Sequence, residues 1–123
     1  MADMLNMISA LGLSLSDVVW LIRRWRGVLL VLEACACGGR WGVKTRGVID
    51  RLGSRSYYYE VLRWLSAKGF VDRVAGRLCD ADPKAPCIPV VWNRLTKKGE
   101  KLLELLKSPR WRELVEEIEL RVV

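Results

Sequence analysis

Apolar side chains recur at helical spacing over the first third of the chain. In the first dozen residues this pattern predicts a short amphipathic helix over residues 2–12. A second helix is expected over residues 17–37, because Ser16 and Asp17 are typical of a helix N-terminus and two glycines follow its end. Gly27 is the expected site of a break within that helix. Residues 40–43 leave room only for a small strand.

The pattern then changes from helices to a hairpin and back. Helices are expected over residues 45–52 and 55–68, with Gly53 between them and Ser54 as the cap of the second. Apolar runs over residues 70–78 and 88–95 predict two strands, and the aspartates and prolines between them predict a loop over residues 79–87. Thr96 is expected to cap a helix that runs to residue 107, and Ser108 followed by Pro109 is typical of the start of a last one.

Two sequence runs resemble a known family. The run from Arg51 to Val71 reads RLGSRSYYYEVLRWLSAKGFV, and it is similar to the helix-turn-helix of the MarR/PadR-like winged-helix regulators. The matching part is L-x-x-L-x-x-K-G-F-V, from Leu62 onward. The run from Arg94 to Leu103, RLTKKGEKLL, resembles the R-L-T-x-K-G-x-x-L-L segment that follows the wing in these families. Three consecutive tyrosines and a wing with two cysteines and two prolines differ from the family pattern.

The resemblance covers about residues 28–107 and implies a fold. It implies an archaeal winged helix-turn-helix protein of the α+β class, mainly α, with a three-helix core and a β-hairpin wing. The chain is then one domain over residues 1–123, with extra helices at both ends. Residues 1–27 are the N-terminal helical extension, residues 28–107 the winged-helix core, and residues 108–123 the C-terminal helix.

Charge and composition narrow the class of protein. The formal net charge is +7, which favours an anionic partner. The segment from residue 40 to residue 98 holds 13 basic and 5 acidic residues, a net of +8, so it carries all of the excess. The chain has no histidine or glutamine and many charged residues, a pattern typical of hyperthermophile proteins. The N-terminus lacks the layout of a signal peptide and arginines interrupt the most apolar stretch, so no membrane span and a cytoplasmic location are expected.

The basic segment coincides with the resemblance to DNA-binding proteins. The resemblance implies binding of double-stranded DNA as a transcriptional regulator, with helix 55–68 in the major groove and wing 70–95 on the backbone or in the minor groove. Arg55 is the candidate for a guanine contact and Arg63 for a phosphate contact. The interpretation places Tyr58 in the core and leaves Tyr57 and Tyr59 equally open to core or surface. The full set of candidate DNA contacts is Lys44, Arg46, Arg55, Ser56, Tyr57, Tyr59, Arg63, Arg73, Arg77 and Lys84.

The four cysteines do not have the spacing of a metal site. Zinc sites favour pairs such as C-x2-C together with histidines, so neither a metal nor another cofactor is expected. Cys79 and Cys87 flank the predicted wing loop and are the candidates for a disulfide, which hyperthermophile proteins form even inside cells. Cys35 and Cys37 face different sides of their helix, and one of them is expected in the core.

No residue pattern indicates catalysis. Histidine, the commonest general base, is absent, and no glycine-rich phosphate loop is present, so the chain is not expected to be an enzyme. The alternative to DNA binding is a winged-helix module that binds other proteins. The extra terminal helices predict a homodimer, which would read two half-sites about 34 Å apart.

Overall fold

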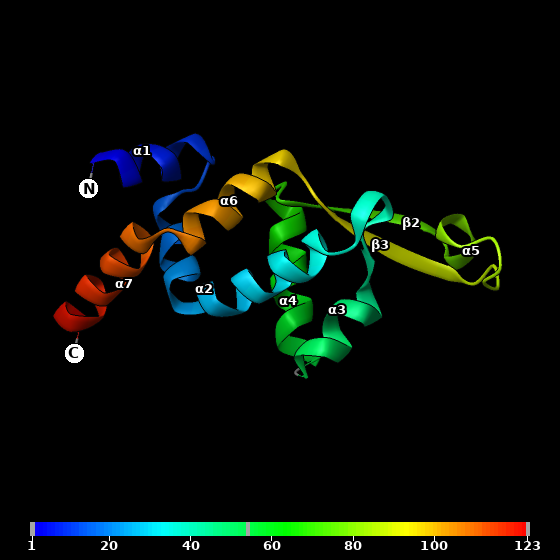
Figure 1. Ribbon diagram of the computed structural model, residues 1–123. Helices are drawn as coiled ribbons and strands as arrows, with labels where there is room; N and C mark the ends of the chain where they lie inside the picture. The colour runs from blue at the N-terminus through cyan, green and yellow to red at the C-terminus, as the bar shows by residue number, and fades with distance from the viewer. Residues whose placement is uncertain (1, 54, 123) are drawn as a thin grey trace.

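A computed structural model describes residues 2–53 and 55–122, with side chains described for residues 6–50, 53 and 56–120. The chain forms a mainly helical α+β fold with one small antiparallel sheet (Figure 1). The elements in chain order are α1 (Ala2–Ala10), α2 (Leu15–Ala36), the 3-10 helix η1 (Gly39–Trp41), β1 (Val43–Lys44), α3 (Thr45–Leu52), α4 (Arg55–Ala67), β2 (Val71–Arg77), α5 (Leu78–Ala81), β3 (Pro89–Leu95), α6 (Lys97–Lys107) and α7 (Pro109–Val122).

The long helix α2 corrects two sequence predictions. Its N-cap is Ser14 and not Ser16, because a capping box forms with Asp17. The Asp17 carboxylate accepts from the Ser14 backbone N–H at 2.9 Å, and the Ser14 hydroxyl accepts from the Asp17 N–H at 3.2 Å. The expected break at Gly27 is wrong, since α2 continues through it to Ala36.

Gly27 instead makes room for a neighbouring helix. It is buried, and a Cβ atom placed on it would lie 2.5 Å from the hydroxyl oxygen of Tyr57 in α4. The glycine therefore serves close packing of α2 against α4, a requirement that the sequence pattern of α2 alone does not contain.

The sheet joins three segments that are far apart in the sequence. Its strand order is β1-β3-β2, with all neighbours antiparallel. In β3, Asn93 pairs with Val43 on one side and with Arg73 on the other. The expected strand over residues 40–43 is wrong in position, because residues 39–41 form a 3-10 helix and the strand follows at Val43.

The hairpin extends away from the helical body, on the side opposite both chain termini (Figure 1). Its two strands agree with the predicted ones to within a residue at each end. The expected loop over residues 79–87 is wrong in part, since the short helix α5 occupies its first three residues. A disulfide joins Cys79 to Cys87 across the tip, with Cα atoms 4.8 Å apart.

The core lies between α2, α3, α4, α6 and the base of the sheet. Its fully buried side chains include Leu21, Val28 and Leu32 of α2 and Leu62 and Leu65 of α4. Helix α7 is held to this core by Trp111, which is fully buried and meets Trp25 edge to face, with ring centroids 6.4 Å apart. Of the two free cysteines, Cys35 is buried and Cys37 is exposed.

The predicted helix starts in the C-terminal third agree with the structure. The Thr96 hydroxyl accepts from the Gly99 N–H at 3.0 Å and so caps α6. Pro109 is the first residue of α7, where its missing N–H costs no helical hydrogen bond. Among the described residues, no helix has both the length and the apolar character needed to cross a membrane.

Candidate functional site

Several predicted site residues line a groove between β1, α3, α4 and the hairpin, which we call the basic groove. Its volume is about 410 Å³. It is lined by Lys44, Thr45, Arg46, Tyr59, Arg73, Leu78, Ile88, Pro89, Val90 and Val91. Four of the predicted site residues, Lys44, Arg46, Tyr59 and Arg73, therefore meet at one place although they come from four elements, β1, α3, α4 and β2.

A second hollow adjoins the basic groove along α4. It is lined by Ser56, Tyr59, Glu60 and Arg63, and Tyr59 is the residue common to both. This arrangement follows from helical spacing, because positions 56, 59, 60 and 63 repeat every three or four residues on one face of a helix. The opposite face of α4 carries the buried Val61, Leu62 and Leu65, so the helix presents a polar face outward.

Tyr59 is the centre of this surface. The guanidinium carbon of Arg63 lies 5.0 Å from its ring centroid, and that of Arg73 lies 5.3 Å from it. Such cation–π contacts hold flexible arginine side chains over a rigid ring. Arg73 beside the phenol, with a smaller effect from Arg63, lowers the pKa of Tyr59 below its ordinary value.

Arg73 is fixed further by a buried hydrogen-bond network. Its Nε donates to Oδ1 of Asn93 at 3.1 Å, and its Nη2 donates to Oγ1 of Thr45 at 3.3 Å. Asn93 is fully buried, and its Nδ2 donates to the Val43 carbonyl at 2.9 Å and to Thr45 Oγ1 at 3.0 Å. The network thus connects β2, β3, β1 and the start of α3 directly beneath the basic groove.

Thr45 and Asn93 are the residues that the sequence prediction missed. A buried asparagine inside a strand is uncommon, since strands disfavour asparagine and buried polar groups need partners. Asn93 is one of only two asparagines in the chain and lies in the middle of a predicted strand. Its position in a predicted strand therefore marks Asn93 as a residue that needs a specific hydrogen-bond partner.

The remaining predicted contacts lie outside the basic groove. Tyr57 is on the α2 side of α4, packed against Gly27. Arg77 and Lys84 are exposed on the outer part of the hairpin. Arg55 is the first residue of α4 and its side chain lies outside the described residues, as does Ser54, the expected cap.

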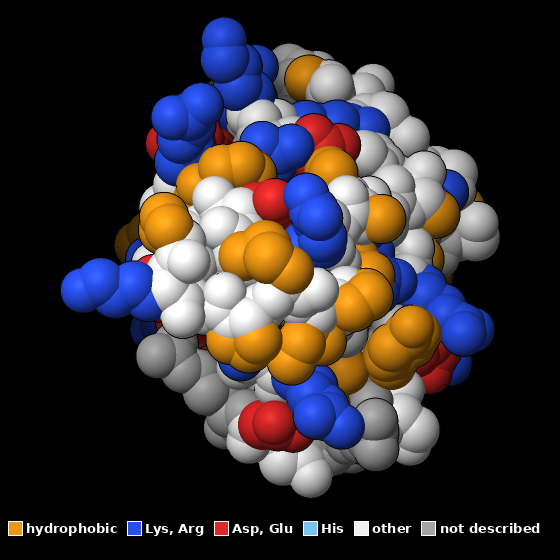
Figure 2. Space-filling view, turned by 90° about the vertical axis from the view of Figure 1, so that its right-hand side faces the viewer, with side chains coloured by type: hydrophobic (Ala, Val, Ile, Leu, Met, Phe, Trp, Pro, Cys, Tyr) orange, Lys and Arg blue, Asp and Glu red, His pale blue; other side chains and the backbone are white. Residues whose placement is uncertain are grey.

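The basic side chains of the groove are not neutralised by carboxylates. Lys68 pairs with Asp17 and Lys107 with Glu33, both away from the groove, and no described carboxylate forms an ion pair with Lys44, Arg46 or Arg73. Figure 2 views the molecule from the hairpin end and shows Lys and Arg side chains distributed around apolar patches. The exposed apolar side chains of the hairpin include Ile88 and Val74. The surface can therefore attract an anion and also contact its apolar parts.

The described part of the chain contains no cluster of three or more histidine, cysteine, aspartate or glutamate side chains that could hold a metal ion. Comparison with known protein families, characterised proteins and solved structures gives no significant match to this chain.

Proposed function

We propose that the protein binds double-stranded DNA through the basic groove and the polar face of α4. In this proposal the fold is a winged helix, with α3 and α4 as the helix-turn-helix and the β2–β3 hairpin as the wing. Helix α4 is placed in the major groove, which is wide enough to admit an α-helix. A role as a transcriptional regulator is part of the same proposal.

The observation that carries the proposal is the convergence of basic side chains around Tyr59. Arg63 and Arg73 stack on its ring, and Lys44 and Arg46 line the same groove. Positive charges that converge on one face and lack carboxylate partners in the described structure are suited to the regularly spaced phosphates of a duplex.

Within this proposal the contacts divide by role. Lys44 and Arg46 stand at the start of α3, where helix N–H groups and the helix dipole add to their attraction for a phosphate. Arg73 is held from below by Asn93, so it can contact a phosphate without losing much side-chain freedom. Ser56 and Glu60 face outward on α4 and are the candidates for contacts with base edges.

A homodimer through the terminal helices belongs to the same proposal. Large apolar side chains are exposed at the end of the molecule away from the hairpin, and Leu15 and Leu120 are each 81% exposed. Burial of such side chains favours self-association. Light scattering of the purified protein tests this part separately, and a monomer at micromolar concentration would contradict it.

The test of DNA binding is fluorescence anisotropy with a random-sequence duplex over a salt series. We expect the double variant Arg46→Gln, Arg63→Gln to bind more weakly and to lower the slope of log affinity against log salt by about 2, since each phosphate contact contributes about 0.9. The matched control is Lys101→Gln, Arg112→Gln, which removes two exposed charges on α6 and α7. It should retain the wild-type slope.

Two results would contradict the proposal. One is the absence of binding by the wild-type protein at about 50 mM salt, where phosphate contacts are least screened. The other is an equal loss of slope in both double variants, which would show that net charge and not the basic groove determines binding. The alternative is then a winged-helix module that binds another protein, and the exposed hairpin residues Val74 and Ile88 are where its partner would be sought.

A further inference from the structure

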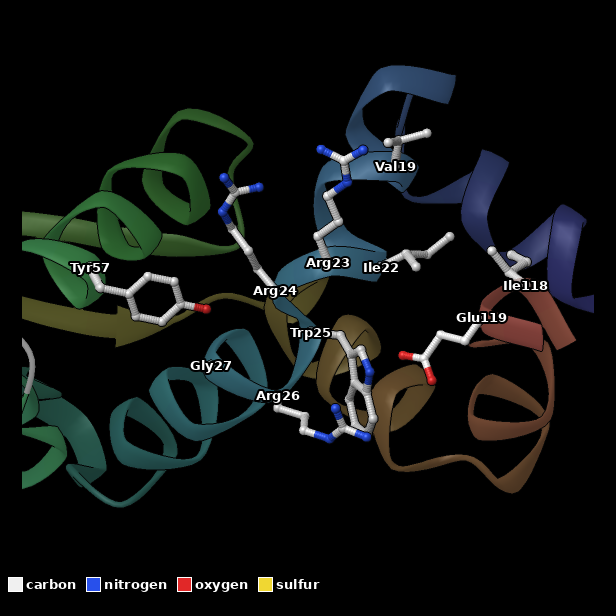
Figure 3. Close-up of a pocket in the computed structure, with 10 residues that line it drawn as sticks. All are labelled: Val19, Ile22, Arg23, Arg24, Trp25, Arg26, Gly27, Tyr57, Ile118 and Glu119. Carbon is white, nitrogen blue, oxygen red and sulfur yellow. The ribbon is translucent and has the colours of Figure 1, made fainter. Parts of the chain in front are cut away.

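A pocket on the other side of α4 is not used by the proposed DNA contacts. It lies along α2 and is bounded by Tyr57 of α4 at one end and by Ile118 and Glu119 of α7 at the other (Figure 3). Its volume is about 590 Å³. The remaining lining residues all belong to α2, and they are Val19, Ile22, Arg23, Arg24, Trp25, Arg26 and Gly27.

The walls of this pocket combine two kinds of chemistry. Val19, Ile22 and Ile118 supply an apolar surface together with the indole of Trp25. Arg23, Arg24 and Arg26, which lie within about one turn of α2, also bring guanidinium groups to it. Figure 3 shows that Arg23 and Arg24 extend to one side of α2, while Arg26 extends to the other side beneath Trp25.

These arginines outnumber the acidic groups at the pocket. Glu119 is the one carboxylate among the residues that line it, which leaves three positive charges against one negative charge. Within the described residues no ion pair joins Glu119 to any of the three. Arg24 and Arg26 instead stack on Trp20 and Trp25, with guanidinium carbons 4.9 Å and 5.0 Å from the ring centroids.

Trp25 forms part of the pocket wall and has a buried indole N–H without a partner in the described structure. Its side chain is 7% exposed, and its Nε1–H has no hydrogen-bond acceptor in the described structure. Trp92 and Trp111 also have unpaired indole N–H groups, but of the three only Trp25 lines this pocket. Because this nitrogen is itself buried, Trp25 contributes the apolar face of its ring to the pocket wall and the N–H does not locate a ligand oxygen.

We propose that this pocket binds a small amphipathic anion, whose apolar body lies against Ile22, Trp25 and Ile118 and whose carboxylate or sulfonate is held by Arg23 and Arg24, which extend to the same side of α2 (Figure 3). A pocket of mainly apolar lining with a few convergent polar groups is typical of small-molecule sites. A second copy of the chain is the competing occupant. A two-fold interface centred here would place the same arginines of both copies against each other, so the charge favours the small anion. The proposal does not depend on DNA binding.

The test uses two fluorescent probes that differ only in charge. 8-Anilinonaphthalene-1-sulfonate carries a sulfonate, and N-phenyl-1-naphthylamine has the same ring system without it. We expect the wild-type protein to bind one sulfonate probe per chain, at least about tenfold more tightly than the neutral probe. This estimate follows because a hydrogen bond to a charged group is worth at least about a factor of ten in affinity.

Three variants locate the site. The double variant Arg23→Gln, Arg24→Gln should lose about tenfold or more in affinity for the sulfonate probe and leave the neutral probe within about twofold. Ile22→Ser should weaken both probes, because it changes the apolar wall and not the charge. The control Lys97→Gln, Lys101→Gln, on exposed positions of α6, should change neither. Thermal unfolding of each variant establishes that it is folded.

Several outcomes would overturn the proposal. Equal affinity for the two probes would show that no anion site exists, and equal losses in the arginine and lysine variants would show non-specific ion pairing. Light scattering should find the same oligomeric state with and without the sulfonate probe. A probe affinity that falls as the protein self-associates would instead assign the pocket to a second copy of the chain. Loss of DNA binding with probe binding intact would refute only the proposed function.

Discussion

The buried amide of Asn93 is predicted to hold the basic groove in shape. Its orientation is fixed by its neighbours, because Arg73 can only donate and the Val43 carbonyl can only accept. Oδ1 must therefore face Arg73, and Nδ2 must face Val43 and Thr45. The substitution Asn93→Ala removes three well-formed hydrogen bonds at once.

The expected cost can be worked out bond by bond. Each of the two Nδ2 bonds contributes about 1 kcal/mol, and the bond from the charged Arg73 contributes about 1.5 kcal/mol or more. The sum is about 3.5 kcal/mol, a large part of the total stability of a small domain, which is about 5–15 kcal/mol. Urea unfolding of wild-type protein and Asn93→Ala, followed by circular dichroism, measures this difference.

A double-mutant cycle separates positioning of Arg73 from general loss of packing. Arg73→Ala, Asn93→Ala and the double variant should show a coupling of about 1.5 kcal/mol, because the two side chains share one charge-assisted bond. Additive effects within about 0.5 kcal/mol, or a loss below about 1 kcal/mol for Asn93→Ala alone, would refute the assignment. Asn93→Asp keeps the acceptor for Arg73 and loses the donors, so it should retain the coupling while it still lowers stability.

Three further predictions concern other parts of the fold. The backbone N–H of Ser14 in the capping box, and then Lys68, hold the pKa of Asp17 below its usual value. The contribution of Asp17 to stability is therefore present above about pH 3.8 and is lost as the pH falls through the lower folded pKa. Melting curves of Asp17→Asn measured over this pH range should lack the acid dependence. Gly27→Ala gains about 1 kcal/mol of helix propensity, but the steric conflict of its Cβ with Tyr57 costs about 1–3 kcal/mol, so the variant should be less stable than the wild-type protein. In a Tyr57→Ala background the same substitution should cause no loss of stability. Cys79→Ser opens a short loop, which should lower stability by about 2–3 kcal/mol in the loop-entropy model and speed hydrogen exchange in the hairpin only.

The sequence predicted those features that depend on neighbours along the chain. Thr96 and Pro109 mark helix starts through local capping rules, and the structure places both as expected. The N-cap of α2 was predicted at Ser16, two residues too late, because Ser14 and Ser16 are both acceptable caps and only the reciprocal bond with Asp17 distinguishes them. Local rules thus find the element but leave its exact boundary open.

Features that depend on distant residues were missed. The role of Gly27 is set by a tyrosine 30 positions later, and the role of Asn93 by Thr45, 48 positions earlier. Neither partner can be identified from the spacing of apolar residues. The side of α4 on which Tyr57 lies could have been predicted from local geometry. Residues two positions apart on a helix, such as Tyr57 and Tyr59, point in directions about 200° apart. Tyr57 and Tyr59 could not both face one ligand, and helical geometry alone would have separated them.

Helix α4 therefore contacts the pocket with one face and the basic groove with the opposite face. Tyr57 contacts α2 at the pocket proposed to bind an anion, while Tyr59, on the opposite side of the same helix, stacks with Arg73 in the basic groove and with Arg63 in the adjoining hollow. A ligand in the pocket can alter the groove only if it binds one position of α4 more tightly than another. Gly27 and Tyr57 are in close contact, so the helix has little freedom to approach α2, and any ligand-driven shift must move α4 outward. An outward shift would move Tyr59 and Arg63 away from Arg73, because Asn93 holds Arg73 at the sheet. The two arginines that stack on the ring of Tyr59 would then separate.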